Sequence, residues 1–336
     1  MSSTNSLSIL LFGATGYLGG SILVGLLKEF PTANITVVAR SDAHDAAIRA
    51  TGAQNILHAD HSNSEAIKTA ASKADVVINA ADADAVDMIN AVLAGLAERK
   101  KSTGKKGVYL HTSGTWYAFD KAEGVFDPSS KYYNDANEED IKSIPADAIH
   151  RKTDELVFAA DKAGDVSGYI VAPGAIFGEG SGPVKRLSVM FMLWAGLGAT
   201  FKKPIIIGDG SNIANSVHID DLVDLYIIVL KRALAGTDGA GVSPYAKFYN
   251  GVSGEIVERE IMTRVAKTLF KTDKLEQISF GEASQAFPMT FAVARNTLAK
   301  SDRGKAIGWT PKHLEPITEG IETGLLTAAS MMGWKV

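Results

Sequence analysis

The glycine pattern Gly13-Ala14-Thr15-Gly16-Tyr17-Leu18-Gly19 constrains the fold of this chain more than any other feature. It follows an apolar run, Ser8–Phe12, and opens a helical pattern that extends from Ser21 to Glu29. In a strand–turn–helix unit the first glycine permits a tight turn, the second lets backbone N–H groups approach a pyrophosphate, and the third lets the helix pack closely. We therefore predict a dinucleotide site that includes Gly13, Thr15, Gly16, Tyr17, Leu18 and Gly19.

Beyond this motif, short apolar runs rich in β-branched residues alternate with segments of helical length. The runs are Ser8–Phe12, Ile35–Ala39, Asn55–His58, Val76–Ala80, Val108–His111 and Tyr169–Ala172. Such alternation predicts an α/β fold with a doubly wound, parallel Rossmann sheet.

The alternation loosens after Phe177 into a glycine-rich loop and an uncharged run, Leu187–Phe201. We predict a Rossmann domain over residues 1–177, completed by about 211–250, and a smaller, mostly helical C-terminal substrate lobe from 178–210 and 251–336. The uncharged run is too short to span a bilayer, so a buried helix is expected. Its side chains Met190, Phe191, Met192 and Trp194 are predicted to form an apolar pocket wall.

Composition narrows the range of partners. The formal net charge is −4 and charged residues make up 21% of the chain, which favours neither nucleic acid nor an anionic membrane as a partner. The chain contains no cysteine, which excludes disulfides and thiolate chemistry and is compatible with a reducing compartment. Met1–Ser8 lacks the basic region of a signal peptide. We expect a cytoplasmic protein with a small-molecule substrate.

Arg40 indicates which dinucleotide is bound. It ends the second predicted strand, where an acidic residue would bind the ribose 2′-hydroxyl of NAD. A guanidinium suits a 2′-phosphate instead, and Ser41 adds a hydroxyl donor, so NADP(H) is the expected cofactor. An ordinary surface arginine is the alternative interpretation. Three further residues at strand ends belong to the predicted cofactor site, Asp60, Ala80 and Ala81, and an ordinary strand terminus is the alternative interpretation for each.

The order of these motifs resembles the extended and atypical short-chain dehydrogenases, which include epimerase/dehydratase-like and NmrA-like proteins. The resemblance extends over nearly the whole chain. It rests on Gly13–Gly19, His111-Thr112-Ser113-Gly114-Thr115, Ala172–Gly178, Val217-His218-Ile219-Asp220-Asp221-Leu222, Phe248–Gly254 and Gly308-Trp309.

The resemblance implies roles for individual residues. Ser113, with Thr112 beside it, would polarise the substrate oxygen, while Pro173, Ala175 and Ile176 would lie beneath the nicotinamide. Lys152 would hold the nicotinamide ribose. The family's tyrosine, four residues before that lysine on the same helix face, is replaced by Ala148.

The proton donor therefore stays open. Tyr117 begins a literal Tyr-x-x-x-Lys match, but the nearby Gly124 and Pro128 indicate a loop. Further candidates are Tyr132, Tyr133, His150 and Lys152 itself. His218 lacks any metal-ligand spacing, so we interpret it as structural and expect no metal site.

We expect an NADPH-dependent reductase of a small, fairly apolar carbonyl, imine or enone. The alternative is a non-redox protein on the same fold, either an NADP(H)-sensing regulator resembling NmrA or a cyclase or isomerase. A sugar-nucleotide epimerase is disfavoured because that chemistry usually needs the missing tyrosine. A homodimer is left open.

Overall fold

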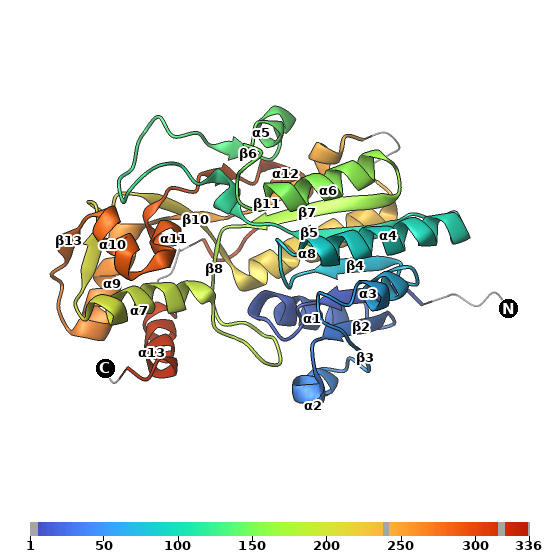
Figure 1. Cartoon of the computed structure of the whole chain (residues 1–336), viewed down its shortest axis with the longest axis horizontal. Helices are drawn as coiled ribbons and strands as arrows, with labels where there is room; N and C mark the ends of the chain where they lie inside the picture. The colour runs from blue at the N-terminus through green and yellow to red at the C-terminus, as the bar shows by residue number, and fades with distance from the viewer. Residues whose placement is uncertain (1–5, 238–241, 315–319, 335–336) are drawn as a thin grey trace.

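A parallel seven-stranded sheet forms the centre of the computed structural model, which describes residues 6–237, 242–314 and 320–334. Residues 1–5, 238–241, 315–319 and 335–336, which the predicted domain ranges and the N-terminal prediction include, lie outside the described residues. The strand order is β11-β7-β5-β4-β1-β2-β3 (Figure 1). The strands are β1 (Ser8–Phe12), β2 (Asn34–Ala39), β3 (Asn55–His58), β4 (Val76–Asn79), β5 (Gly107–Thr112), β7 (Val166–Pro173) and β11 (Phe248–Gly251). The doubly wound Rossmann fold is confirmed.

Helices cover both faces of this sheet because its strands are apolar on both sides, as parallel strands usually are. One face packs against α1 (Tyr17–Glu29) and α8 (Ile219–Ala235), with Leu11, Leu26 and Tyr226 in the shared core. The other face packs against α3 (Ser64–Ala71), α4 (Val86–Thr103) and α6 (Arg151–Lys162). A short helix, α2 (Asp45–Ala50), precedes β3.

A third buried core forms a separate lobe beside the sheet. Its helices are α7 (Val189–Phe201), α9 (Glu258–Phe270), α10 (Phe280–Ala286), α11 (Phe291–Ala294) and α13 (Ile321–Met331), with β9 (Ile205–Ile207) paired to β13 (Glu276–Ile278). The buried helix expected over Leu187–Phe201 is present as α7. Met190, Phe191 and Trp194 pack into this core, and only Met192 is half-buried, so the predicted pocket wall is largely interior packing.

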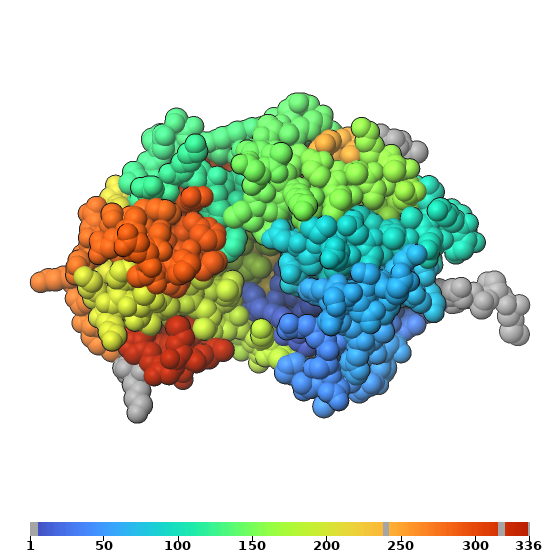
Figure 2. Space-filling view, in the orientation of Figure 1, coloured from blue at the N-terminus to red at the C-terminus, as the bar shows by residue number. Residues whose placement is uncertain are grey.

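Short strands connect the two parts. β8 (Ala175–Phe177), β10 (Ile213–His218) and β12 (Gly254–Val257) form a three-stranded sheet, and β6 (Tyr133–Asn134) pairs with β14 (Ala299–Lys300). The remaining elements are α5 (Glu138–Lys142), α12 (Asp302–Ala306) and the 3₁₀ turns η1 (Asp42–His44), η2 (Thr115–Ala118), η3 (Pro244–Lys247) and η4 (Pro288–Thr290). The molecular surface is hollowed between the sheet and the lobe (Figure 2).

The C-terminal segment returns to the sheet before it enters the lobe. Trp309 is buried in the core that α1 and α8 share, and its Nε1 donates to the Asp221 carbonyl over 2.7 Å. The Asp221 carboxylate accepts the backbone N–H groups of Lys312 and His313, each over 2.9 Å. These contacts join the segment 309–313, here called the C-terminal strap, to the start of α8.

No helix in the described ranges is long and apolar enough to cross a membrane.

Candidate functional site

The carboxyl ends of the sheet strands bring most of the predicted site residues to one edge. The parallel register pairs Phe12 with Asn79 and Asn79 with His111. The segments that follow β1, β4 and β5 therefore lie side by side. In open α/β sheets this edge is where ligands bind.

Gly13 and Gly19 make the turn after β1 a tight cradle. Gly13 has φ +90°, and a Cβ there would lie 2.3 Å from the Ala80 carbonyl oxygen. A Cβ on Gly19 would lie 2.2 Å from the Gly13 oxygen, and the Gly16 N–H donates to that oxygen over 2.8 Å. No side chain fits at Gly13 or Gly19, which is the requirement of a backbone cradle for a pyrophosphate.

The start of α1 adds favourable electrostatics. Gly16 occupies its N-cap without a side-chain cap, and the first turn carries no acid. Unsatisfied N–H groups at a helix N-terminus attract anions. Thr15 and Leu18 are half-buried in this turn.

The glycine-rich loop after β8 lies against the start of α1. Tyr17 Oη donates to the Gly178 carbonyl over 2.8 Å, and burial raises the pKa of that phenol. Gly182 lies so close to Gly20 that a Cβ on Gly182 would be 2.7 Å from the Gly20 Cα. The Ser181 N–H also donates to Ser21 Oγ over 3.2 Å.

Arg40 and Ser41 are exposed directly after β2, at the same edge of the sheet. Ala80 is half-buried and Ala81 exposed after β4. Asp60 is exposed too, but its carboxylate already accepts the N–H and hydroxyl of Ser62, which lowers its pKa. Arg40 is thus open to a ligand, whereas Asp60 is engaged by its own loop.

Ser113 lies at the centre of the edge and is backed by a buried polar cluster. Its Oγ is 3.0 Å from Asp154 Oδ2, and Asp154 Oδ1 is 3.7 Å from His111 Nε2. His111 and Asp154 are fully buried. Burial raises the pKa of Asp154 to about 8 and lowers the pKa of His111 to about 3.

The other residues expected near the nicotinamide differ from Ser113 in burial and in hydrogen-bond partners. Thr112 Oγ1 is 2.6 Å from Tyr226 Oη on α8, so this hydroxyl is used within the fold. Pro173 is buried at the end of β7, while Ala175 and Ile176 are half-buried in β8.

The helix expected to carry Ala148 and Lys152 begins later than predicted. α6 starts at Arg151, after His150 adopts φ +69°, and Ala148 lies in the preceding turn. Lys152 and Ala148 therefore do not share a helix face, and that part of the prediction is wrong. Lys152 is exposed and makes no hydrogen bond or ion pair to the described residues, whereas Arg151 is buried and paired with Glu155 over 2.6 Å.

His150 lies against Gly114, the residue that follows Ser113. Its Nδ1 is 3.0 Å from Asp84 Oδ2, and its Nε2 is 3.1 Å from where a Cβ on Gly114 would stand. Its ring stacks on Trp116 with centroids 6.4 Å apart. Asp84 orients this imidazole toward the turn after β5.

The tyrosine candidates are placed elsewhere. Tyr117 is fully buried and its Oη donates to Asn250 Oδ1 over 2.8 Å, so its predicted catalytic role conflicts with its structural one. Tyr133 packs edge-on against Tyr117. Tyr132 Oη donates to Glu255 over 3.1 Å at an exposed position.

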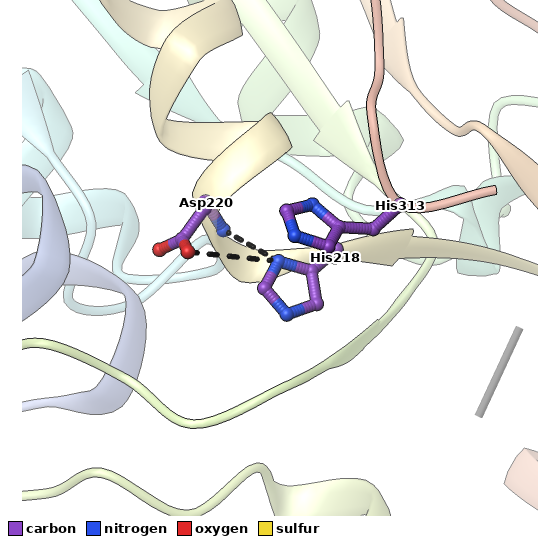
Figure 3. Close-up of side chains that lie close together, drawn as sticks. All are labelled: His218, Asp220 and His313. Carbon is purple, nitrogen blue, oxygen red and sulfur yellow. Dashed lines mark hydrogen bonds and ion pairs between the residues drawn. The ribbon is translucent and has the colours of Figure 1, made fainter. Parts of the chain in front are cut away.

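His218 is not the lone histidine that the sequence shows. Its side chain, Asp220 and His313 bring one ligand atom each to within 4.8 Å of one another (Figure 3). The two imidazole rings stack with centroids 3.9 Å apart and 23° between their planes, so their in-plane lone pairs do not converge on one ion. His218 Nδ1 accepts the Asp220 N–H, and His313 Nδ1 is 3.3 Å from Asp221 Oδ2. The arrangement fastens the C-terminal strap to α8.

The model of the NAD dependent epimerase/dehydratase family matches residues 9–240. The chain belongs to this family. The predicted resemblance to extended short-chain dehydrogenases is thereby confirmed. The oxidase ucsJ from Acremonium sp. is 26% identical, with 96% of this chain and 97% of the relative covered.

Solved structures of this family share the fold. The dTDP-glucose 4,6-dehydratase of Bacillus anthracis, solved in complex with NAD, has a TM-score of 0.62 at 16% identity, with 98% of each chain covered. The UDP-glucose 4-epimerase of Thermotoga maritima has a TM-score of 0.63 at 13% identity, with 97% of this chain and 99% of the epimerase covered.

Sequence reasoning missed Asp154, His111 and Asp84. One signal was present for Asp154, because it occupies the buried face of α6 together with Val157, Phe158 and Asp161, at spacings of three, four and seven residues. A carboxylate on such a face is seldom left without a function or a partner. For Asp84 no sequence signal existed, since its partner His150 is distant in the chain.

Proposed function

We propose that this chain is an NADP(H)-dependent reductase of a small, fairly apolar carbonyl, imine or enone. The observation that carries the proposal is the shared edge of the sheet where the glycine cradle, Arg40 and Ser113 follow the parallel strands β1, β2 and β5. The family name and the NAD bound to the Bacillus anthracis dehydratase support a nicotinamide cofactor. The related oxidase supports redox chemistry.

Each group at this edge has a distinct part in the proposal. The cradle residues and the N-terminus of α1 would hold the pyrophosphate, and Arg40 with Ser41 the 2′-phosphate. A bound reduced nicotinamide supplies hydride. Ser113 would bind the substrate oxygen, and Lys152 stays a prediction for the nicotinamide ribose.

The preference for an apolar substrate rests on an aromatic cluster beside Ser113. Trp116 contacts Phe119 and Phe291, with ring centroids 5.6 and 5.8 Å apart, and stacks on His150. We propose that residues 178–210 and 251–336 form the substrate lobe, with the third core as its interior.

We also propose a small-molecule partner and a cytoplasmic location. The lack of cysteine supports the location, because it is compatible with a reducing compartment.

Turnover tests the function directly. Purified protein with NADPH is expected to reduce at least one member of a panel of aromatic and aliphatic ketones, imines and enones, followed at the NADPH absorbance. Tight NADPH binding with no oxidation by any member would contradict the reductase.

The cofactor is tested by Arg40→Asp. This variant is expected to weaken NADPH binding by on the order of 1.5–3 kcal/mol, the range for hydrogen bonds to charged groups, and to affect NADH far less. Arg49→Asp, the same charge change at an exposed position on the nearby α2, is the control and should leave both affinities close to wild type. Calorimetric titration measures both. An equal loss for NADH and NADPH would refute the 2′-phosphate assignment.

The second candidate is a non-redox protein on this fold, and the absence of a tyrosine from α6 favours it. Product formation without a change in NADPH would identify a cyclase or isomerase. A partner protein retained in only one redox state of the cofactor would identify a sensor related to NmrA.

A further inference from the structure

A directional chain of polar groups leads from β4 to Ser113. The Ala81 N–H donates to Asn79 Oδ1 over 3.1 Å, which turns the Asn79 amide nitrogen toward His111 Nδ1 at 3.4 Å. Tyr109 Oη lies 3.2 Å from the same Nδ1. The Asn79 amide nitrogen can only donate, and the Tyr109 hydroxyl is able to donate to the same Nδ1 of His111.

These contacts favour the tautomer of His111 in which Nδ1 accepts. Burial lowers its pKa to about 3, so the ring is neutral and carries one proton. Because Nδ1 accepts, that proton is on Nε2, which faces Asp154 Oδ1 across 3.7 Å. In the described part of the chain, Nε2 and Oδ1 are both buried and neither has a hydrogen-bond partner.

The orientation of His111 in turn places the proton of Asp154. An N–H facing Oδ1 favours a bare oxygen there, so a protonated Asp154 carries its hydrogen on Oδ2, the oxygen 3.0 Å from Ser113 Oγ. Ser113 Oγ donates to an ionised Asp154; when Oδ2 carries the proton, the Asp154 O–H can donate to Ser113 instead, which frees the Ser113 hydroxyl hydrogen for the site.

The charged groups around Asp154 are compatible with a neutral carboxyl. The pKa of Asp154 is raised to about 8, chiefly by desolvation and to a lesser extent by the Asp84 and Glu155 carboxylates. Ser113 and the Arg151 guanidinium lower it. Tyr109 on β5 and Tyr117 on η2 face the same region, and burial holds the pKa of each phenol high, so both stay neutral.

We propose that Asp154 holds a proton on Oδ2 and relays it through Ser113 to the substrate oxygen, in place of the missing tyrosine. The relay rests on the proposed reductase function. As hydride from the reduced nicotinamide reaches the substrate carbon, the Ser113 proton passes to the substrate oxygen and the Asp154 proton replaces it on Oγ. Asp154 is left ionised and regains a proton from water by the same route after product leaves. Asp154 acts through Ser113 and is thus a positioning and relay residue.

The protonation state is tested without turnover. Carbon NMR of protein labelled with ¹³C-carboxyl aspartate is expected to show one resonance that titrates near pH 8 and is lost in Asp154→Asn. If that variant does not fold, Ser113→Ala serves, because removing the Ser113 hydrogen bond should shift the same titration to higher pH. An Asp154 signal that titrates below pH 5 overturns the proposal.

The catalytic consequence is tested by the pH dependence of kcat. Wild type is expected to lose rate as pH rises through about 8, since the acid is then ionised, whereas Asp154→Asn is expected to lose about 10²-fold in kcat and the dependence with it. His150→Gln is the matched comparison and should keep the decline near pH 8. A decline that disappears in His150→Gln and persists in Asp154→Asn assigns the donor to His150 and overturns the relay.

The two experiments distinguish failure of the proposed reductase function from failure of the proposed Asp154 relay. A resonance near pH 8 without any NADPH oxidation refutes the reductase and leaves a protonated Asp154 established. NADPH oxidation with an ionised Asp154 refutes the relay and keeps the reductase.

Discussion

Gly13 and Gly52 both have positive φ, but only Gly13 meets the backbone of a neighbouring strand end. The strand before Gly13 and the helix after it make that requirement visible in the sequence. The ionisation of Asp154 was not predictable, because its pKa depends on burial and on the hydrogen bond with Ser113, 41 residues earlier in the chain. At this scale, backbone requirements can be predicted from local motifs, whereas pKa values arise from contacts between distant residues.

Gly13→Ala separates conformational strain from steric conflict. Gly52, at φ +107° with no atom of the described residues within 4 Å of where a Cβ would stand, reports the strain alone, and Gly52→Ala should cost about 1–2 kcal/mol. Gly13→Ala adds the conflict with Ala80, so we expect a further ~1–3 kcal/mol. Urea unfolding measures both variants. Equal losses of unfolding free energy in the two variants would show that the turn at Gly13 has room for a Cβ beside Ala80.

For most strands of the central sheet, the bounds predicted from the hydrophobic pattern are close to those in the structure. β1 and β3 have the predicted bounds, β2, β4 and β5 differ by one residue at one or both ends, and β7 begins three residues before the predicted Tyr169. The start of α6 was misplaced, because His150 at φ +69° separates Ala148 from the helix, and sequence propensity does not report such a turn. The two- to four-residue elements of the lobe, such as β14 and α11, are too short to leave a periodic signal.

The late start of α6 predicts the outcome of restoring the family tyrosine. Ala148→Tyr places a phenol in a turn, off the helix face that carries Arg151 and Asp154. A well-positioned acid contributes about 10²-fold or more, so we expect less than about tenfold gain in kcat from this variant. Steady-state kinetics with NADPH decide the matter. A gain of about 10²-fold would mean that the turn already presents position 148 to the substrate.

Across the whole molecule, the alternation of apolar runs with helical segments predicted the sheet, and its loosening after Phe177 predicted a second lobe. The contacts of the C-terminal strap became visible only in the structure. Asp221 is buried, and both of its carboxylate oxygens accept backbone N–H groups from Lys312 and His313. The sequence contains the motif of Asp220 and Asp221 but does not reveal which of the two points inward.

Asp221→Ala is expected to destabilise the fold by about 3 kcal/mol, because two N–H groups lose a charged acceptor at about 1.5–3 kcal/mol each and only part is recovered by water. Asp220→Ala, at a side chain that is 62% exposed, is the control and should cost less than about 1 kcal/mol. Thermal unfolding and limited proteolysis beyond Trp309 measure the effect. Similar losses of stability in both variants would mean that contacts other than those of Asp221 hold the C-terminal strap.

The burial of Trp309 beneath the sheet bears on how the protein is made. The ribosome releases the glycine cradle first, yet the core beneath that cradle includes the indole of Trp309, which is synthesised much later. The edge strand β11 likewise arrives only after the first part of the lobe. The nascent sheet therefore keeps an apolar face exposed until Trp309 is synthesised. A truncated chain that ends before Trp309 is expected to bind chaperones and not to function on its own.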